Sequence, residues 1–235
     1  MFNYFKADFF RATKESSFRG TILLIVAISL VFSYLFRNES GQEGYWETQS
    51  MLTSFIPLYF MSITNFFWGE DIYYRTINNV IIKSNSRSSI FIYKVAATLI
   101  TSFAIILLNL CLIAIIRGII GFQVSGYYLF TIFCNQLPIY SCLIMLCIFI
   151  FIYLDRSYQA YISYIIIILL FDQLFGFVID SMFETNFMDD FLMMTNLKEI
   201  CVNDVFFTKT SSVALVFSIV YFSASYTIFI RKEFK

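Results

Sequence analysis

Long runs of apolar residues, separated by shorter polar stretches, extend along nearly the whole chain. A helix needs about 20 mostly apolar residues to cross the roughly 30 Å of hydrocarbon in a membrane. Runs of this length recur, so the pattern predicts an all-α, polytopic membrane protein with six transmembrane helices. The predicted spans are residues 20–36, 50–69, 90–120, 127–154, 157–179 and 211–230.

The first 18 residues have a different, amphipathic pattern. Phe2, Phe5, Phe9 and Phe10 alternate with charged residues at spacings of three and four. This spacing places the aromatic side chains on one face of a helix and the charged ones on the other. We therefore expect residues 1–18 to form an interfacial helix whose basic residues face anionic headgroups. A disordered tail is the alternative.

The composition agrees with a membrane protein and narrows the possible functions. Of the 235 residues, 59% are hydrophobic and 14% are charged, whereas soluble proteins have about 45–50% apolar and about 25% charged residues. Histidine, the commonest general base and metal ligand, is absent. The formal net charge is zero, which gives no basic patch for nucleic acid. We expect one transmembrane domain over residues 1–235, with no enzyme activity and no cofactor or metal bound by this chain.

Basic residues gather in the loops on one side of the predicted membrane. Cytoplasmic loops of membrane proteins are enriched in Lys and Arg, so both termini are expected in the cytoplasm, beneath the plasma membrane. An even number of spans requires the two termini to share a side. The residues on this side are Lys6, Arg11, Lys14, Arg19, Arg75, Lys83, Arg87, Lys94, Arg156, Arg231, Lys232 and Lys235.

The longest cytoplasmic loop, residues 70–89, contains a second amphipathic pattern. Tyr73, Ile77, Val80 and Ile81 fall at helical spacing before a polar turn ends the pattern. This predicts a short helix with one apolar face. An ordinary juxtamembrane loop is the alternative.

A long loop on the other side, residues 180–210, precedes the last span. Phe187, Phe191, Met194 and Leu197 fall at helical spacing within it. We expect this outer loop to be partly helical, with short helices that dip into the outer leaflet or cap a cavity. An exposed loop is the alternative.

Several features of the cytoplasmic loop occur together in one order. An acidic residue ends the second span. It is followed in order by a Thr-Ile pair, an Asn, an aliphatic pair, a Ser-Arg turn and a Lys that enters the third span. In this pattern the chain resembles the permease subunits of type-2 class ATP-binding-cassette exporters, which often have Gly before the Thr, where this chain has Arg. The matching positions are Glu70, Arg75-Thr76-Ile77, Asn79, Ile81-Ile82, Ser86-Arg87 and Lys94.

The resemblance implies that residues 70–89 couple the permease to an ATPase. This chain has no P-loop motif, so the resemblance implies a separate cytoplasmic ATP-binding-cassette ATPase that uses ATP and Mg²⁺. It also implies a dimer with a second permease copy or a paralogue, which exports amphipathic peptides such as bacteriocins or lantibiotics, or hydrophobic compounds, from a bacterial cell. The expected coupling residues are Glu70, Tyr73, Arg75, Thr76, Ile77, Asn79, Val80, Ile81 and Arg87.

A few polar residues lie inside the predicted spans. Asp172 and Gln173 are near the middle of the fifth span, where a charged Asp costs on the order of 2.5–3.5 kcal/mol. Asn135 and Gln136 interrupt the fourth span, and Asn109 lies in the third. We expect these residues to line a substrate path. The alternative is that they are polar contacts that hold helices together.

Two other functions fit the pattern of spans. An ion-coupled secondary transporter could use Asp172 as a proton carrier, but it would have inverted repeats, and the two halves of the sequence show none. A membrane sensor or scaffold without an ATPase partner is the other possibility.

Overall fold

The computed structural model is helical throughout the residues that it describes and contains no strand there. The predicted all-α class is therefore confirmed. Within this described part of the chain, four helices are long and apolar enough to cross a membrane, which supports membrane insertion. They are α2 (Ser16–Leu35), α7 (Arg87–Ile120), α8 (Gly126–Tyr153) and α11 (Lys209–Arg231). The described residues are 7–8, 10–12, 14–38, 41–84, 86–121, 124–154, 156–183, 191–199 and 208–232.

Two of the six predicted spans are not established as spans. Pro57 interrupts the second predicted span, and the structure divides this span into shorter segments. Pro57 lies in the first turn of the second segment, where its missing N–H is tolerated, and the preceding helix ends before it. The fifth, α9 (Ser157–Phe183), has a described apolar stretch of only Ser157–Leu170. The segments of the second are α3 (Gly41–Thr53), α4 (Ile56–Thr64), the π-helix η1 (Asn65–Gly69) and α5 (Glu70–Tyr73).

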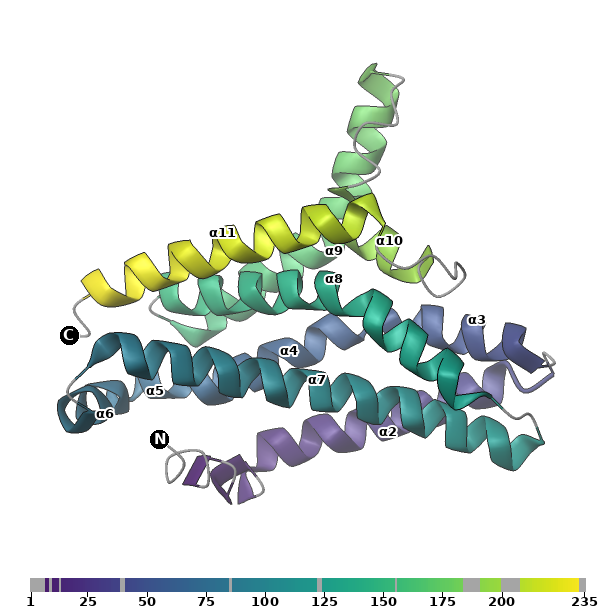
Figure 1. The fold of residues 1–235 in the computed structure, drawn as a ribbon, viewed down its shortest axis with the longest axis horizontal. Helices are drawn as coiled ribbons and strands as arrows, with labels where there is room; N and C mark the ends of the chain where they lie inside the picture. The colour runs from purple at the N-terminus through teal and green to yellow at the C-terminus, as the bar shows by residue number, and fades with distance from the viewer. Residues whose placement is uncertain are drawn as a thin grey trace.

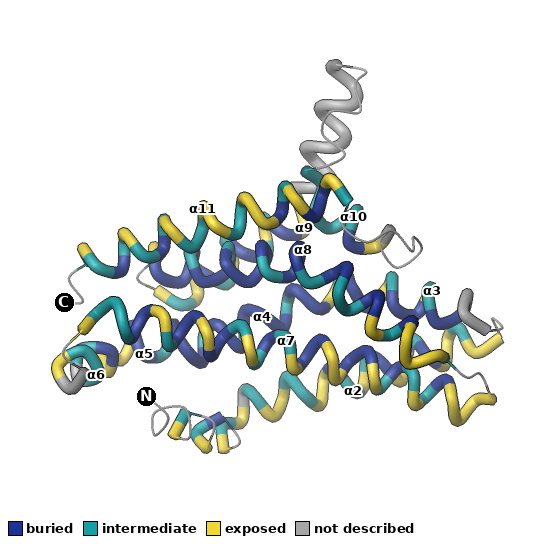
Figure 2. The backbone as a smooth tube through the Cα atoms, in the orientation of Figure 1, coloured by how far each residue is buried: buried dark blue, intermediate teal, exposed yellow. Residues whose placement is uncertain are grey.

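The long helices lie side by side along the bundle, with α8 at its centre (Figure 1). Most of α8 is buried, whereas α2 and α11 are largely exposed (Figure 2). The most extensive packing in the chain is between α8 and α11. In this arrangement α8 forms the core, and the flanking helices turn apolar faces outward.

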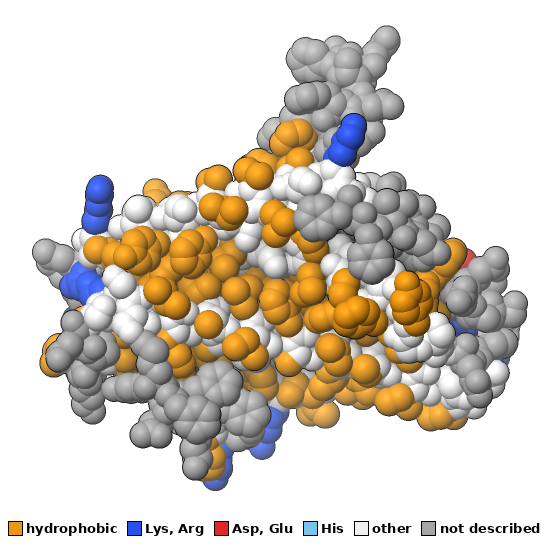
Figure 3. Space-filling model, in the orientation of Figure 1, with side chains coloured by type: hydrophobic (Ala, Val, Ile, Leu, Met, Phe, Trp, Pro, Cys, Tyr) orange, Lys and Arg blue, Asp and Glu red, His pale blue; other side chains and the backbone are white. Residues whose placement is uncertain are grey.

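The outward faces of these helices carry large apolar side chains. Figure 3 shows them over the middle of one face of the molecule, with Lys and Arg side chains at its edges. An apolar surface of this extent marks contact with membrane or protein. Exposed members include Leu23, Leu30 and Val31 in α2, Ile100, Leu107 and Ile115 in α7, and Val216 and Ile219 in α11.

Both ends of the described chain lie at one end of the bundle, together with α6 (Thr76–Ser84) (Figure 1). Two hydrogen bonds tie this end together: Arg87 Nη1 donates to the carbonyl of Ile230, at 2.8 Å, and Lys232 Nζ donates to that of Ile152, at 2.7 Å. The two termini therefore lie on the same side of the bundle (Figure 1). That this side is cytoplasmic stays a prediction.

Local signals place the helix ends close to their predicted positions. The hydroxyls of Ser86, Ser125 and Thr208 accept hydrogen bonds from backbone N–H groups in the first turns of α7, α8 and α11. Gly121 ends α7 with a left-handed φ of 104°, a conformation that favours glycine. These caps are short-range features, and the sequence alone indicates them.

The outer loop contains the predicted helical turn. Helix α10 (Met193–Glu199) packs against α3, and its Leu197 is buried. This confirms that the loop is partly helical. Phe187 lies outside the described residues.

Candidate functional site

Two cations and one carboxylate meet where the N-terminal segment, α5 and α7 converge. Lys94, which is only 2% exposed, donates a hydrogen bond from Nζ to Asp71 Oδ2. Arg11 Nη1 donates to the other oxygen, Oδ1, at 3.2 Å. The Asp71 carboxylate thus joins the segment before α2 to α7.

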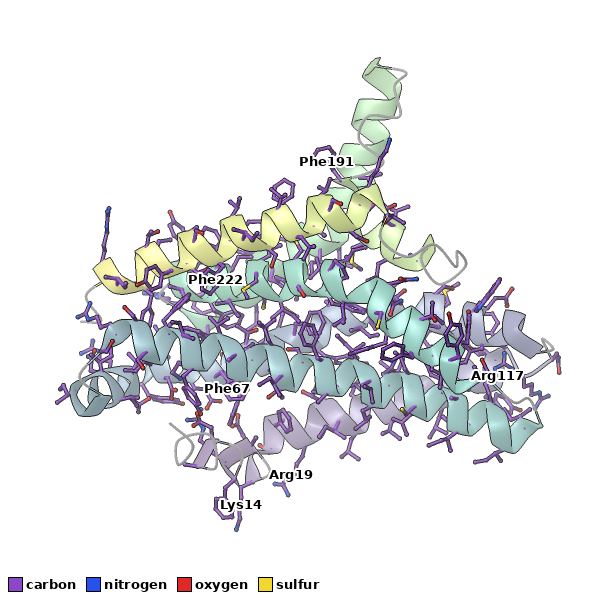
Figure 4. The ribbon with its side chains drawn as sticks, in the orientation of Figure 1. Lys14, Arg19, Phe67, Arg117, Phe191 and Phe222 are labelled. Carbon is purple, nitrogen blue, oxygen red and sulfur yellow. The ribbon has the colours of Figure 1, made fainter. Side chains whose placement is uncertain are left out.

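The same two cations also bond backbone carbonyls of the π-helix. In η1 the N–H of Glu70 bonds the carbonyl of Asn65, five residues back. A π turn interrupts the α pattern of bonds, so carbonyls here are accessible to side-chain donors. Arg11 Nη2 donates to the carbonyl of Phe66, at 2.6 Å, and Lys94 Nζ donates to that of Phe67. Figure 4 shows Phe67 toward the end of the bundle that carries the N-terminal segment.

Gly69 makes the close packing of this π-helix possible. A Cβ at this position would lie 2.2 Å from Asn65 Oδ1 and 3.0 Å from a ring carbon of Phe151. Both distances are shorter than normal van der Waals contact. The glycine is therefore required by the approach of α8 and by the Asn65 side chain.

A sharp turn at Arg75 separates α5 from α6. Arg75 has a φ of 59°, in the left-handed region that favours glycine. The next residue, Thr76, donates a hydrogen bond from Oγ1 to Asp71 Oδ1, at 2.9 Å. Asp71 therefore also holds the start of α6, and one carboxylate connects the N-terminal segment, α7 and the surface helix.

The electrostatic environment keeps Asp71 ionised. Burial by itself would raise the pKa of Asp71, but the charge and hydrogen bond of Lys94 lower it, and Arg11 and Thr76 lower it further. The result is a pKa below the usual range. Asp71 thus carries its negative charge at neutral pH and balances the buried Lys94.

A pair of carboxyl groups, Glu15 and Glu70, lies beside this cluster. Arg11 Nη2 is 3.6 Å from Glu70 Oε2, and Glu15 approaches Glu70 from the N-terminal segment. Burial, a hydrogen bond with Glu70 and the negative charge of Glu70 raise the pKa of Glu15 to about 7, although Arg11 lowers it. Glu15 therefore binds or releases its proton near neutral pH.

The predicted coupling residues fall into two environments. Tyr73, Arg75 and Thr76 are exposed at the surface, whereas Ile77 is 0% exposed and packs inside this chain. In this structure Tyr73 is accessible to a partner and Ile77 is covered by its own chain, and the coupling role of both residues stays a prediction. The burial of Ile77 follows from the sharp turn at Arg75, which folds α6 back against α7.

The remaining coupling residues lie near the surface of the same end. Val80 and Ile81 are half-buried against the core, and Ile82 is 75% exposed. Arg87 bonds the carbonyls at the end of α11. The side chain of Asn79 lies outside the described residues. The exposed apolar position of α6 is therefore Ile82.

The residues predicted for a substrate path are buried between helices of one chain where the structure describes them. Asn109 Oδ1 accepts a hydrogen bond from Ser29 Oγ, at 3.0 Å, and joins α7 to α2. Asn135 and Gln136 are buried in α8. For Asn109 the alternative of a polar contact between helices is thus favoured. The side chains of Asp172 and Gln173 lie outside the described residues.

Another buried cation lies toward the opposite end of the bundle from Phe67 (Figure 4). Arg117 of α7 is fully buried, and its Nη1 donates to the carbonyl of Phe36 at the end of α2, at 3.0 Å. A cationic donor suits these carbonyls, because the last turn of a helix leaves them without intrahelical partners. Arg117 therefore joins α2 to α7 at this end.

Sequence reasoning missed the role of Asp71 and assigned Arg11 to lipid headgroups. Arg11 instead bonds Asp71 and the π-helix. The sequence does contain one sign of the role of Asp71. Lys94 is a cation inside the predicted third helix, and it needs an anion nearby. Asp71 is an acidic residue just before the loop that leads to that helix.

Comparisons with known proteins do not assign a family. The sequence matches no family model, and no curated protein is significantly similar to it. Within the described part of the chain, no three Cys, Asp or Glu side chains are grouped so that they could hold a metal ion. The cluster around Asp71 connects the N-terminal segment, α5, the start of α6 and α7.

Proposed function

We propose that this chain is the permease subunit of an ATP-driven exporter of the type-2 class. A separate cytoplasmic ATPase subunit hydrolyses ATP with Mg²⁺ and docks near α6. This chain contributes six spans, and a second copy or a paralogue of it completes the permease as a dimer. The complex moves amphipathic peptides or hydrophobic compounds out of a bacterial cell, with both termini of this chain in the cytoplasm.

The observation that carries this proposal is the joint at Asp71. A surface helix can transmit force to membrane helices only if the connection between them is stiff. Here α6 begins at Thr76, which bonds Asp71, and Asp71 bonds Lys94 in α7 and Arg11 before α2. A movement of α6 is therefore passed to two membrane helices through one buried carboxylate.

The backbone at Arg75 gives independent support to the resemblance. The exporter permeases often have glycine directly before the Thr, and this chain has Arg there. Its φ of 59° is the conformation that glycine adopts with the least strain. The turn before α6 therefore has the geometry for which a glycine is suited.

The proposal is tested with a cassette ATPase, sought first among the reading frames that neighbour the gene for this chain. The two proteins are expressed together, and the permease is purified in nanodiscs. We expect Ile82→Asp to weaken ATPase binding by about 30-fold, because losing an interface hot spot costs about 2 kcal/mol. The 75% exposure of Ile82 means that this change leaves packing within the permease intact.

Ser86→Asp is the matched control. It adds the same charge close to α6, at an exposed position where Asp can replace the Ser cap of α7. It should retain ATPase binding and hydrolysis. If no ATPase is recovered with the wild-type chain, or if Ile82→Asp binds as well as wild type, the proposed coupling is incorrect.

A further inference from the structure

A polar cavity of about 620 Å³ lies beside the Asp71 cluster, between η1–α5 and the start of α9. This volume is in the range of small-molecule sites, about 300–1,000 Å³. Two charged side chains of opposite sign line it, Glu70 from α5 and Arg156 from the connection between α8 and α9. The cavity is thus built from separate parts of the chain and offers both an anion and a cation.

Four tyrosines supply the aromatic lining. The rings of Tyr73 and Tyr74 meet edge to face, with centroids 5.0 Å apart. Tyr161 is half-buried, and its ring packs on Phe151 at 5.5 Å. The fourth tyrosine, Tyr158, follows the start of α9. Such a concentration of exposed aromatic faces beside a carboxylate is the chemistry that recognises organic ammonium groups.

The two charges are held in place differently. The Arg156 guanidinium donates to the hydroxyl of Tyr158, at 3.0 Å, and lies 6.0 Å from the centre of its ring. The Glu70 side chain is 30% exposed, and Arg11 is 3.6 Å away on the cluster side. Arg156 therefore has further N–H groups that can bind an anion, and the exposed part of the Glu70 carboxylate can contact a cation.

The position of the cavity suits the membrane surface. It lies where α8 ends and α9 begins, at the end of the bundle that contains both termini. Tyrosines are enriched at the level of lipid headgroups. A headgroup in the adjoining leaflet can therefore reach this cavity without entering the core of the protein.

We propose that this cavity binds a zwitterionic group that carries both an ammonium and a phosphate. The ammonium lies against the tyrosine faces near Glu70, and the phosphate is bound by Arg156. A phospholipid headgroup and a free phosphorylated amino alcohol share this chemistry. The proposal goes beyond the exporter function and does not depend on it, because every residue involved belongs to this chain.

Binding of small probes to the full chain tests the proposal. The protein is placed in nanodiscs of phosphatidylglycerol, which lacks an ammonium, and is titrated by calorimetry with phosphocholine, choline or methyl phosphate. We expect phosphocholine to bind at least about tenfold more tightly than either single-charge probe, because it makes one more charge-assisted contact. Equal affinities for the three probes would overturn the proposal.

Variants test which residue binds the ammonium of the probe and which binds its phosphate. Arg156→Gln should lower phosphocholine affinity to that of choline, and Tyr73→Leu should weaken both ammonium probes but not methyl phosphate. Tyr127→Leu, an exposed tyrosine in the first turn of α8, is the matched control and should change nothing. Because Arg156 and Tyr73 are exposed, these variants leave the packing of the chain intact. Unchanged phosphocholine binding in Arg156→Gln would refute the assignment.

A second set of nanodiscs distinguishes the two sources of the ligand. If phosphatidylethanolamine in the membrane lowers the affinity for phosphocholine, the lipid headgroup occupies the cavity. If it does not, the cavity serves a soluble molecule. Both results support a zwitterion site, whereas absence of phosphocholine binding in both membranes would contradict it. ATPase binding is not measured here, so failure of this test leaves the exporter proposal unaffected.

Discussion

Neutralising Asp71 tests whether one carboxylate holds together the end of the bundle that carries both termini. Asp71→Asn keeps the size of the side chain but removes its charge. Lys94, which is 2% exposed, can then still donate its hydrogen bond to the Phe67 carbonyl, but its positive charge has lost the carboxylate that neutralises it. We therefore expect the variant to be clearly destabilised.

The size of this effect follows from the burial of the partners. Leaving one partner of a buried ion pair without its counterion costs about 3–5 kcal/mol. The Arg11 side chain is 38% exposed, so the loss of its contact adds less than about 1 kcal/mol. An Asn oxygen can still accept the hydrogen bond from Thr76. The expected loss in the free energy of unfolding is thus about 3–5 kcal/mol, and most of it comes from Lys94.

The assay uses two cysteines as reporters of unfolding. Cys142 and Cys147 are buried in α8, so a thiol-reactive dye labels them only when the bundle opens. The protein is unfolded by denaturant in a background in which the other cysteines are serine. Glu70→Gln is the matched control, because its partly exposed contact with Arg11 at 3.6 Å contributes less than about 1 kcal/mol.

A double variant separates charge from shape. Asp71→Asn with Lys94→Met removes both buried charges, and we expect most of the lost stability to return. If Asp71→Asn is within about 1 kcal/mol of wild type, the ion pair does not stabilise the fold as argued. A double variant that is no more stable than Asp71→Asn would likewise show that the unpaired Lys94 is not the cause.

Three further predictions concern the same end of the bundle, each measured as the free energy of unfolding. Gly69→Ala should lower the free energy of unfolding by about 1–3 kcal/mol through overpacking, and adding Asn65→Ala should recover part of this loss. An unchanged free energy of unfolding in Gly69→Ala would mean that position 69 has room for a Cβ. Arg75→Gly should be neutral or stabilising. Arg75→Val should be at least about 1–2 kcal/mol less stable than Arg75→Gly, because a Cβ is strained at a φ of 59° and a β-branched side chain is tolerated there least. Equal stability of the two variants would contradict this reasoning. The pKa of Glu15 is about 7 in the folded chain against an ordinary 4.5, so the folded state binds more protons between these values and stability should fall as the pH rises through them. Glu15→Gln should remove this pH dependence, and a slope that persists in the variant would show that another group causes it.

Helix positions could be predicted well because their signals are local. The third predicted span, 90–120, corresponds to α7, Arg87–Ile120, and the last, 211–230, to α11, Lys209–Arg231. Apolar runs of this length, Ser or Thr caps and a terminal Gly specify a helix without reference to the rest of the chain. The partly helical outer loop was predictable for the same reason.

The candidate site could be predicted only in part. The apolar pattern located α6 correctly, but an amphipathic pattern says which side chains share a face and not what covers that face. The structure shows Ile77 covered by its own chain and Ile82 exposed. The difference arises at Arg75, whose left-handed backbone sets the direction of α6 and leaves no clear mark in the sequence.

By itself, the sequence determined that this protein is helical, that it carries long apolar helices suited to a membrane, and where most of them begin and end. These properties depend on hydropathy and on hydrogen bonds within a few residues. Only the tertiary structure decided that Asp71 joins Arg11 and Lys94, since these residues are separated by 60 and 23 positions in the chain. A buried charge must find a counterion, but which anion lies within reach depends on how the helices pack. The π-helix at Asn65–Gly69 was decided in the same way, because its carbonyls find donors in neighbouring segments.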